Sequence, residues 1–309
     1  MKIALSYRVD YYPQAEGLTK SQMKRAEPVP VESYARSVEH YLREAGVEVT
    51  NVYTDPQCSL EGFDVYLELD NGRDAAGDLA FGRRRFSSAR LQRAVWFVDS
   101  HGQGDLHHLL SPHYDHVFFS VWSKRDLFAE HKSAHWCPNA TDSRWFYPVV
   151  GEPQYDFGFF GSTMGLDRAD KMVDICEKHG FAFDVRQVGG PFKHKWPRTC
   201  HAMNGCATLF NHGQKHDGPN LRVLESMAIG RPLITDLDPR DGMSKLFVDG
   251  EHFLGYEAYT FKGLEEKMLY AKAHPGWCLG MAQKARDLVL GKHLVQHRVQ
   301  QMLEVFGSV

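Results

Sequence analysis

The stretch 218–236 constrains the fold of this chain more than any other part of the sequence. From Leu221 onward, apolar residues recur at i, i+3 and i+7, which predicts a helix with one apolar face. Gly230 stands where a left-handed residue commonly ends a helix, and the apolar run 233–235 is typical of a strand covered on both faces. The stretch therefore predicts a helix, a tight turn and a buried strand of an α/β sheet.

The same alternation runs through the rest of the chain. Strands are expected at 3–7, 47–53, 64–69, 94–98, 114–121, 155–160, 181–188, 207–211, 233–235 and 253–256. Helices are expected at 31–45, from about 123, and at 167–179, 221–228, 261–273, 277–290 and 293–306. Strands that alternate with helices indicate a parallel, doubly wound α/β fold. Residues 151–153 look like a linker between two such series, so we expect one domain at 1–150 and another at 151–290.

Composition and charge exclude several classes of protein. A formal charge of -3 argues against binding of duplex DNA by bulk electrostatics. No stretch approaches the roughly 20 apolar residues that span a bilayer, and the N-terminus becomes polar too soon for a signal peptide. The six cysteines show neither a C-x-x-C pair nor a zinc spacing. We therefore expect a cytoplasmic protein with reduced thiols.

The start of the 221–228 helix is a candidate site for an anion. The first N–H groups of a helix have no intrahelical partner and attract phosphate. Arg222 lies in the first turn, where its guanidinium could pair with a phosphate, or it is a solvated helix arginine. Glu225 follows one turn later, so a cation and a carboxylate lie near one site. An ordinary αβ unit with a surface glutamate is the alternative interpretation.

The acidic residues around this helix resemble those of a known family. Seven residues separate Asp217 from Glu225, and Gly230, any residue and Pro232 follow. This order looks like the E-x7-E region of GT-B nucleotide-sugar glycosyltransferases. The run 220–225 is similar to their group related to spore-maturation glycosyltransferase-like proteins. The resemblance implies two Rossmann-like domains that face each other across a cleft, with a last helix, 291–309, that packs back on the first domain. It also implies that Glu225 holds the ribose hydroxyls of the donor, while Asp217 is one methylene shorter than the family's first glutamate.

The resemblance assigns further donor-binding residues to the second domain. Gly161 and Ser162 follow its first strand, where glycine lets the backbone approach a diphosphate and a helix N-terminus adds favourable charge. Arg168 corresponds to an arginine of the family, although the Lys-Gly that follows it in many relatives is missing here. A plain αβ turn is the alternative. The full set of expected donor-binding residues is Gly161, Ser162, Arg168, Gly189, Lys215, Asp217, Asn220, Leu221, Arg222 and Glu225.

Candidate catalytic residues come from the first domain. Asp99 and His101 follow the apolar strand 94–98, at the edge where an open α/β sheet presents catalytic groups. One of them could take the proton from an acceptor hydroxyl while the other orients it, or they are an N-cap aspartate and a surface histidine. If the reaction retains the anomeric configuration, no such base is needed and His101 would bind the donor sugar.

No metal site is expected. Asp236 and Asp238 match the D-x-D metal motif of the other glycosyltransferase fold, GT-A, but they come late in the chain, after a strand. GT-B enzymes generally work without a bound metal, because side chains and helix dipoles stabilise the leaving diphosphate.

These expectations describe a hexosyl- or pentosyltransferase that moves a sugar from a nucleotide-diphosphate donor to an acceptor hydroxyl. The nucleotide sugar is a co-substrate, and no cofactor is expected. A nucleotide-sugar epimerase of the same fold and a non-catalytic nucleotide-sugar-binding protein are the alternatives. The acceptor could be a small molecule, a glycan or modified DNA; the basic run 82–85 would contact DNA, or it is a solvated face.

Overall fold

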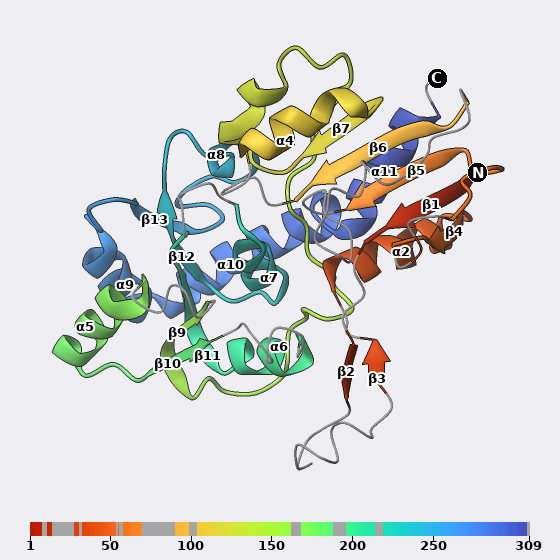
Figure 1. Ribbon diagram of the computed structural model, residues 1–309. Helices are drawn as coiled ribbons and strands as arrows, with labels where there is room; N and C mark the ends of the chain where they lie inside the picture. The colour runs from red at the N-terminus through yellow and green to blue at the C-terminus, as the bar shows by residue number, and fades with distance from the viewer. Residues whose placement is uncertain are drawn as a thin grey trace.

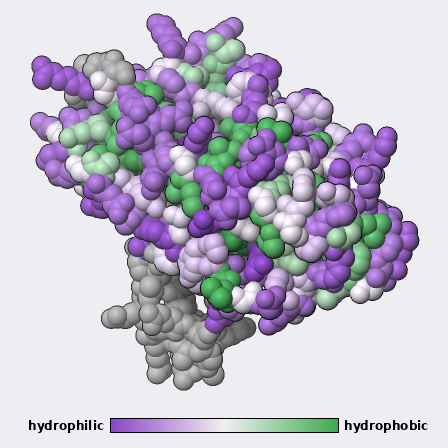
Figure 2. Space-filling model, turned by 180° about the vertical axis from the view of Figure 1, so that it is seen from behind, coloured by the Kyte–Doolittle hydropathy of each residue, from purple (hydrophilic) through white to green (hydrophobic). Residues whose placement is uncertain are grey.

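The chain forms two lobes, each built on a parallel sheet (Figure 1). The computed structural model describes residues 1–7, 11–13, 28–30, 33–53, 55, 58–69, 90–98, 104–161, 168–187, 196–213 and 219–307. None of the helices in these ranges combines the length and the apolar character that a membrane crossing requires. Hydrophilic side chains cover much of the face seen in Figure 2, with smaller hydrophobic groups between them.

The first lobe has a six-stranded sheet in the order β4-β1-β5-β6-β7-β8. Its strands are β1 (Lys2–Ser6), β4 (Glu48–Asn51), β5 (Val65–Leu69), β6 (Gln92–Phe97), β7 (His116–Phe119) and β8 (Ala134–Trp136). Neighbouring strands run parallel. β5 is buried along its whole length, as expected for a strand covered on both faces.

Helices cover both faces of this sheet. They are α2 (Tyr34–Glu44), α4 (Gly104–Leu110), the 3-10 helices η1 (Ser111–His113) and η2 (Trp122–Phe128), and α11 (Val295–Phe306). Ile3 and Leu5 face α2 and α11, whereas Ala4 points to the opposite core with η2. The expected α-helix from about 123 is a 3-10 helix, which suits a short segment whose N-cap residue, Val121, provides no side-chain hydrogen bond.

The second lobe has a five-stranded sheet in the order β10-β9-β11-β12-β13, again parallel throughout. Its strands are β9 (Tyr155–Gly161), β10 (Phe183–Gln187), β11 (Cys206–Asn211), β12 (Leu233–Leu237) and β13 (Leu254–Glu257). Its helices are α5 (Asp170–His179), α6 (Trp196–Asn204), α7 (Leu221–Ala228), α8 (Met243–Leu246), α9 (Leu264–Ala273) and α10 (Pro275–Lys292). Gly230 has φ 72°, so the predicted left-handed end of α7 is confirmed.

Two short strands interrupt the stretch 8–31, which the sequence presents as a loop. β2 (Tyr11–Pro13) and β3 (Pro28–Pro30) form an antiparallel pair. The pair projects away from the sheet of the first lobe (Figure 1). It was missed because the prolines that mark this stretch as a loop also suit the edge of a two-stranded sheet.

The chain crosses between the lobes twice, and the two crossings lie side by side. The Thr141 N–H donates to the His293 carbonyl at 3.2 Å, and the Val295 N–H donates to the Thr141 carbonyl at 3.0 Å. After the second crossing, α11 packs against α2, and Val299 and Phe306 join the core of the first lobe. The predicted return of the last helix is therefore confirmed, while the domain boundaries at 150 and 290 stay predictions.

The carboxyl ends of the two sheets face each other at the junction between the lobes. Trp136 ends β8, and Gly242 follows β12 in the other lobe; a Cβ on this glycine would lie 2.8 Å from Trp136 Cζ2. Lys245 Nζ lies 4.4 Å from the centre of the Trp122 ring. The loops that follow the strands of one sheet therefore meet those of the other, as the GT-B resemblance implies.

Candidate functional site

The start of α7 is tied to the carboxyl edge of the second sheet. Asn220 caps the helix, because its Oδ1 accepts a hydrogen bond from the Val223 N–H at 3.2 Å. Its Nδ2 donates to Asn211 Oδ1 at 3.2 Å, at the end of β11. Asn211 Nδ2 in turn donates to Thr235 Oγ1, on β12, at 2.9 Å. The cap residue therefore positions the helix N-terminus over the ends of two neighbouring strands.

Glu225 is a buried carboxylate one turn into α7. Its side chain is 6% exposed, and its Oε2 forms an ion pair with Arg222 Nη1 but accepts no hydrogen bond of regular geometry within the described ranges. Burial raises the pKa of Glu225 to about 7, and the positive charge of Arg222 opposes part of this rise. A buried carboxylate oxygen that has an ion pair but no regular hydrogen bond is unusual in a native protein and leaves acceptor capacity for a ligand.

Arg222 is mostly buried as well. Its side chain is 18% exposed, and Nη1 contacts Met203 Sδ, on α6, at 3.3 Å. Its Nε has no hydrogen-bond partner among the residues described. Arg222 is therefore not the solvated arginine of the alternative interpretation, and its contact with a phosphate stays a prediction.

Arg168 lies at the same edge of the sheet. Its Nη1 donates to the carbonyl of His212, just after β11, at 2.7 Å. Its guanidinium carbon lies 5.6 Å from the centre of the Phe159 ring. A Cβ on Gly161 would lie 2.4 Å from that ring and 3.4 Å from Arg168 Nη2. Glycine at 161 thus leaves room for Phe159, which in turn supports Arg168.

The structure also reveals one polar residue of this edge, Tyr256, that the sequence did not single out. Tyr256, at β13, hydrogen-bonds His212 Nδ1 at 2.7 Å and donates to the Asn211 carbonyl at 3.2 Å. Burial raises the pKa of Tyr256 well above its usual value. No local spacing in the sequence predicts this contact, because it depends on the order of strands in the sheet.

The acidic residues at the end of β12 and just after it hold the backbone nearby. Asp236 Oδ1, near the end of β12, accepts from the Gly213 N–H at 2.9 Å, two residues after β11. Asp238 pairs with Arg240 at 2.6 Å, and Asp241 accepts from the Met243 N–H at 2.7 Å, at the start of α8. Burial raises the pKa of Asp241 to about 7. Within the described ranges, no group of three or more His, Cys, Asp or Glu side chains is arranged to hold a metal ion.

The predicted donor residues that the structure describes come together at one place. Gly161, Arg168, Asn220, Leu221, Arg222 and Glu225 lie at the ends of β9 and β11 and in the first turns of α7. The other predicted residues lie outside the described residues and stay predictions. They are Asp99, His101, Ser162, Gly189, Lys215 and Asp217.

Two cavities of the second lobe lie elsewhere. One of about 420 Å³ opens where β9 and β11 begin, at the edge opposite Glu225, and is lined by Arg231 and Lys272. Another of about 400 Å³ lies along α6 and is lined by Arg186 and His201. Neither position fits the ligand-binding edge of an open α/β sheet.

Known proteins resemble this chain in family and in fold. Residues 152–304 match the family model described as glycosyl transferase-like. No curated protein sequence matches. The fold is similar to that of sucrose-phosphate synthase from Thermosynechococcus elongatus, with a TM-score of 0.64 and 11% identity over 99% of this chain and 98% of that chain. It is also similar to that of a glycosyltransferase from Rickettsia africae, with a TM-score of 0.62 and 11% identity over 99% of this chain and 98% of that chain. HepE of Anabaena, solved with UDP and glucose, has a similar fold as well, with a TM-score of 0.62 and 11% identity over the whole of both chains.

The fold and the position of the site define a GT-B protein of the glycosyltransferase type. Two Rossmann-like lobes present their carboxyl edges to each other, and a last helix returns to the first lobe. The glycosyl transferase-like family model covers the second lobe and most of the returning helix α11. The narrower likeness to spore-maturation glycosyltransferase-like proteins stays a prediction.

Proposed function

We propose that the protein moves a sugar from a nucleotide-diphosphate donor to an acceptor hydroxyl, with the donor ribose bound by Glu225. The observation that carries the proposal is the buried Glu225 carboxylate, whose Oε2 is held within the described ranges only by its ion pair with Arg222. An ionised carboxylate only accepts hydrogen bonds, and the two neighbouring ribose hydroxyls are donors. The hydroxyls would therefore use the acceptor capacity that the ion pair with Arg222 leaves on this carboxylate.

The start of α7 and Arg168 would hold the diphosphate. A capped helix start offers free N–H groups and a partial positive charge, both of which favour a phosphate. Arg168 adds a guanidinium at the same edge of the sheet. Both groups would stabilise the charge that develops on the leaving diphosphate, so transfer needs no metal.

The proposed donor is a nucleotide sugar, and UDP-sugars are the first to test. HepE, which shares the fold, has been solved with UDP-glucose (TM-score 0.61, 11% identity). Asp99 and His101 remain the proposed catalytic residues, because in the sequence they follow β6, whose carboxyl end lies at the edge of the sheet where open α/β folds bind ligands. The acceptor is proposed to be a small molecule or a glycan, with modified DNA as the further possibility from the basic run 82–85.

A thermal-shift experiment tests the donor site. UDP, GDP, ADP and dTDP, each with and without glucose, are added to the wild type, to Glu225→Gln and to the matched control Glu266→Gln, an exposed glutamate on α9. A ligand at a hundredfold its dissociation constant stabilises the folded state by about 2.7 kcal/mol. We expect one nucleotide to stabilise the wild type and the control but not Glu225→Gln.

Two outcomes contradict the proposal. One is the absence of any nucleotide effect on the wild type, and the other is an equal effect on Glu225→Gln. A coupled assay then separates the activities. Transfer requires an acceptor, whereas an epimerase converts the free nucleotide sugar, and a binding protein does neither.

A further inference from the structure

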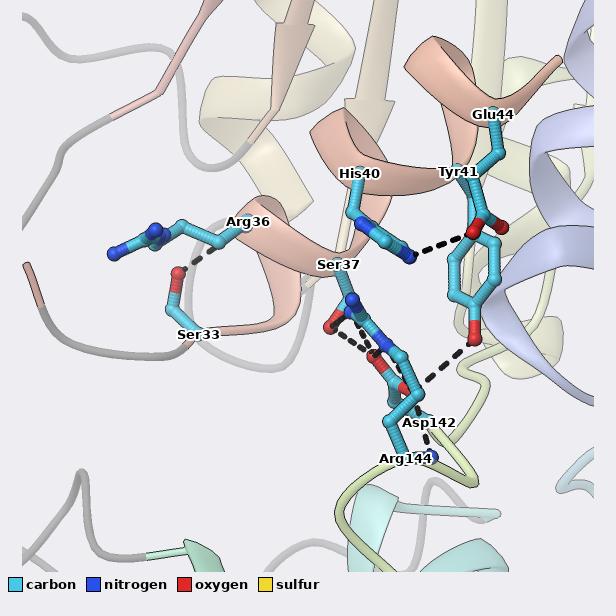
Figure 3. A network of polar contacts seen from close by, with 8 residues as sticks. All are labelled: Ser33, Arg36, Ser37, His40, Tyr41, Glu44, Asp142 and Arg144. Atoms are coloured by element: carbon cyan, nitrogen blue, oxygen red, sulfur yellow. Dashed lines mark hydrogen bonds and ion pairs between the residues drawn. The ribbon is translucent and has the colours of Figure 1, made fainter.

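The first crossing between the lobes is anchored to the first lobe (Figure 3). The buried Asp142 carboxylate accepts hydrogen bonds from Ser37 Oγ at 2.6 Å and Tyr41 OH at 3.2 Å, both on α2. Arg144 Nε donates to the same carboxylate at 3.0 Å. Burial by itself raises the pKa of Asp142, but the hydrogen bonds from Arg144 and Ser37 outweigh it and hold that pKa below its usual range. The crossing thus carries a fully bonded, ionised carboxylate.

The first lobe also holds the backbone on either side of Asn139 in this crossing. Arg298 Nε, on α11, donates to the Pro138 carbonyl at 2.7 Å. The Ala140 N–H donates to Tyr34 OH, on α2, at 3.1 Å. The backbone on both sides of Asn139 therefore moves with the first lobe.

The Asn139 side chain reaches the second lobe. Its Nδ2 donates to the Pro219 carbonyl at 3.4 Å, one residue before the cap of α7. A carbonyl only accepts hydrogen bonds, so the amide nitrogen faces Pro219 and Oδ1 faces away. Asn139 is 9% exposed, and Oδ1 has no hydrogen-bond partner among the described residues.

The chemistry of Oδ1 restricts what it can bind. A buried amide oxygen is normally paired, and its partner must donate a hydrogen. A phosphate diester has no hydrogen to donate, whereas a sugar hydroxyl has one. Asn139 approaches the helix start, where the diphosphate is proposed to lie, from the first lobe. The part of the donor that extends from the last phosphate toward that lobe is the sugar.

We infer that Asn139 Oδ1 accepts a hydrogen bond from a hydroxyl of the transferred sugar. This inference rests on the proposed function, because it takes a nucleotide sugar as the ligand. Asn139 is then a specificity-determining residue supplied by the lobe opposite the nucleotide site. It links recognition of the sugar to the contact between the lobes at Pro219.

Binding measurements on Asn139→Leu test the inference. Leucine keeps about the same size but provides no acceptor oxygen. Calorimetry is run with UDP, GDP, ADP and dTDP, and with their glucose, galactose and N-acetylglucosamine derivatives. One neutral hydrogen bond is worth on the order of tenfold in affinity. We expect Asn139→Leu to bind the free nucleotide within about twofold of wild type and its sugar derivative about tenfold more weakly.

Thr141→Val is the matched control. Thr141 lies two residues further along the same crossing, is buried, and has a hydroxyl without a hydrogen-bond partner in the described part of the chain. Valine keeps its shape, so nucleotides and nucleotide sugars should bind to it as to the wild type.

Singly deoxygenated donors identify the hydroxyl. One of the singly deoxygenated donors should bind to the wild type about tenfold more weakly than the unmodified donor. Asn139→Leu should bind both donors equally well. This wild-type series also tests the inference if Asn139→Leu does not fold. A series in which no single hydroxyl changes affinity by more than about twofold overturns it.

The failure of the inference differs from the failure of the proposed function. If the wild type binds no nucleotide, the proposed function is wrong, and the inference falls with it. If a nucleotide binds through Glu225, but Asn139→Leu weakens the sugar derivative no more than the free nucleotide, only the inference is wrong.

Discussion

Two buried carboxylates, Asp142 in the first crossing and Glu225 on α7, show how the two regions differ. Asp142 accepts hydrogen bonds from Ser37, Tyr41 and Arg144, and its pKa is lowered. Glu225 Oε2 has an ion pair with Arg222 but accepts no regular hydrogen bond in the described ranges, and the pKa of Glu225 is raised to about 7. One carboxylate is saturated by the protein, and the other leaves capacity for a ligand. We interpret the first as structural and the second as functional.

The largest expected effect is at the saturated carboxylate. Asp142→Asn removes the buried charge that accepts hydrogen bonds from Ser37 and Arg144 and should lower the free energy of unfolding by about 3 kcal/mol, because hydrogen bonds to a charged group are worth about 1.5–3 kcal/mol each. Urea denaturation at pH 7 measures the change. The control is Asp126→Asn, which removes an exposed ion pair with Arg125 and should have almost no effect. Equal stability of both variants would contradict the structural role of Asp142.

The same chemical change at Glu225 should have the opposite sign. Ionised Glu225 is unfavourable in the folded protein, since its pKa rises from 4.5 to about 7. Glu225→Gln should therefore raise the free energy of unfolding by about 2 kcal/mol at pH 8, while nucleotide binding is lost. A loss of stability at pH 8 would show that the Arg222 pair outweighs the burial of the charge.

The gain from Glu225→Gln should depend on pH. A carboxyl whose folded pKa is raised contributes stability that is fully present below pH 4.5 and is lost as the pH rises through about 7. The variant and the wild type should thus have equal stability near pH 4 and diverge up to about pH 8. Asp241, whose pKa is also raised to about 7, is present in both proteins and cancels in the difference. Urea denaturation of both proteins across this range provides the test.

A smaller effect is expected where the lobes touch. Alanine at Gly242 would place a Cβ 2.8 Å from Trp136 Cζ2 and 3.0 Å from Trp122 Cβ. Overpacking of this kind lowers the free energy of unfolding by about 1–2 kcal/mol. The control, Gly276→Ala on α10, has no atom within 4 Å of the new Cβ and should be neutral or stabilising. Thermal unfolding of both variants measures the difference. Equal stability would show that the side chains at the junction move to accommodate the added methyl group.

The elements near the donor site could be predicted from the sequence because their signals are local. Apolar spacing and Gly230 located α7 and its end, and family resemblance singled out Glu225 and Arg168. The roles of Asn139 and Tyr256 could not be predicted. Asn139 contacts a residue 80 positions away, and Tyr256 reaches His212 across 44 positions. Such contacts depend on the order of strands and on how the lobes meet, which no spacing along the chain records.

The backbone pairing of Thr141 with His293 and Val295 brings both crossings to one place. A rigid-body rotation of one lobe against the other would therefore bend both chain crossings at the same place, beside Thr141. Cleavage of one crossing by a protease would leave the two lobes covalently joined through the other crossing.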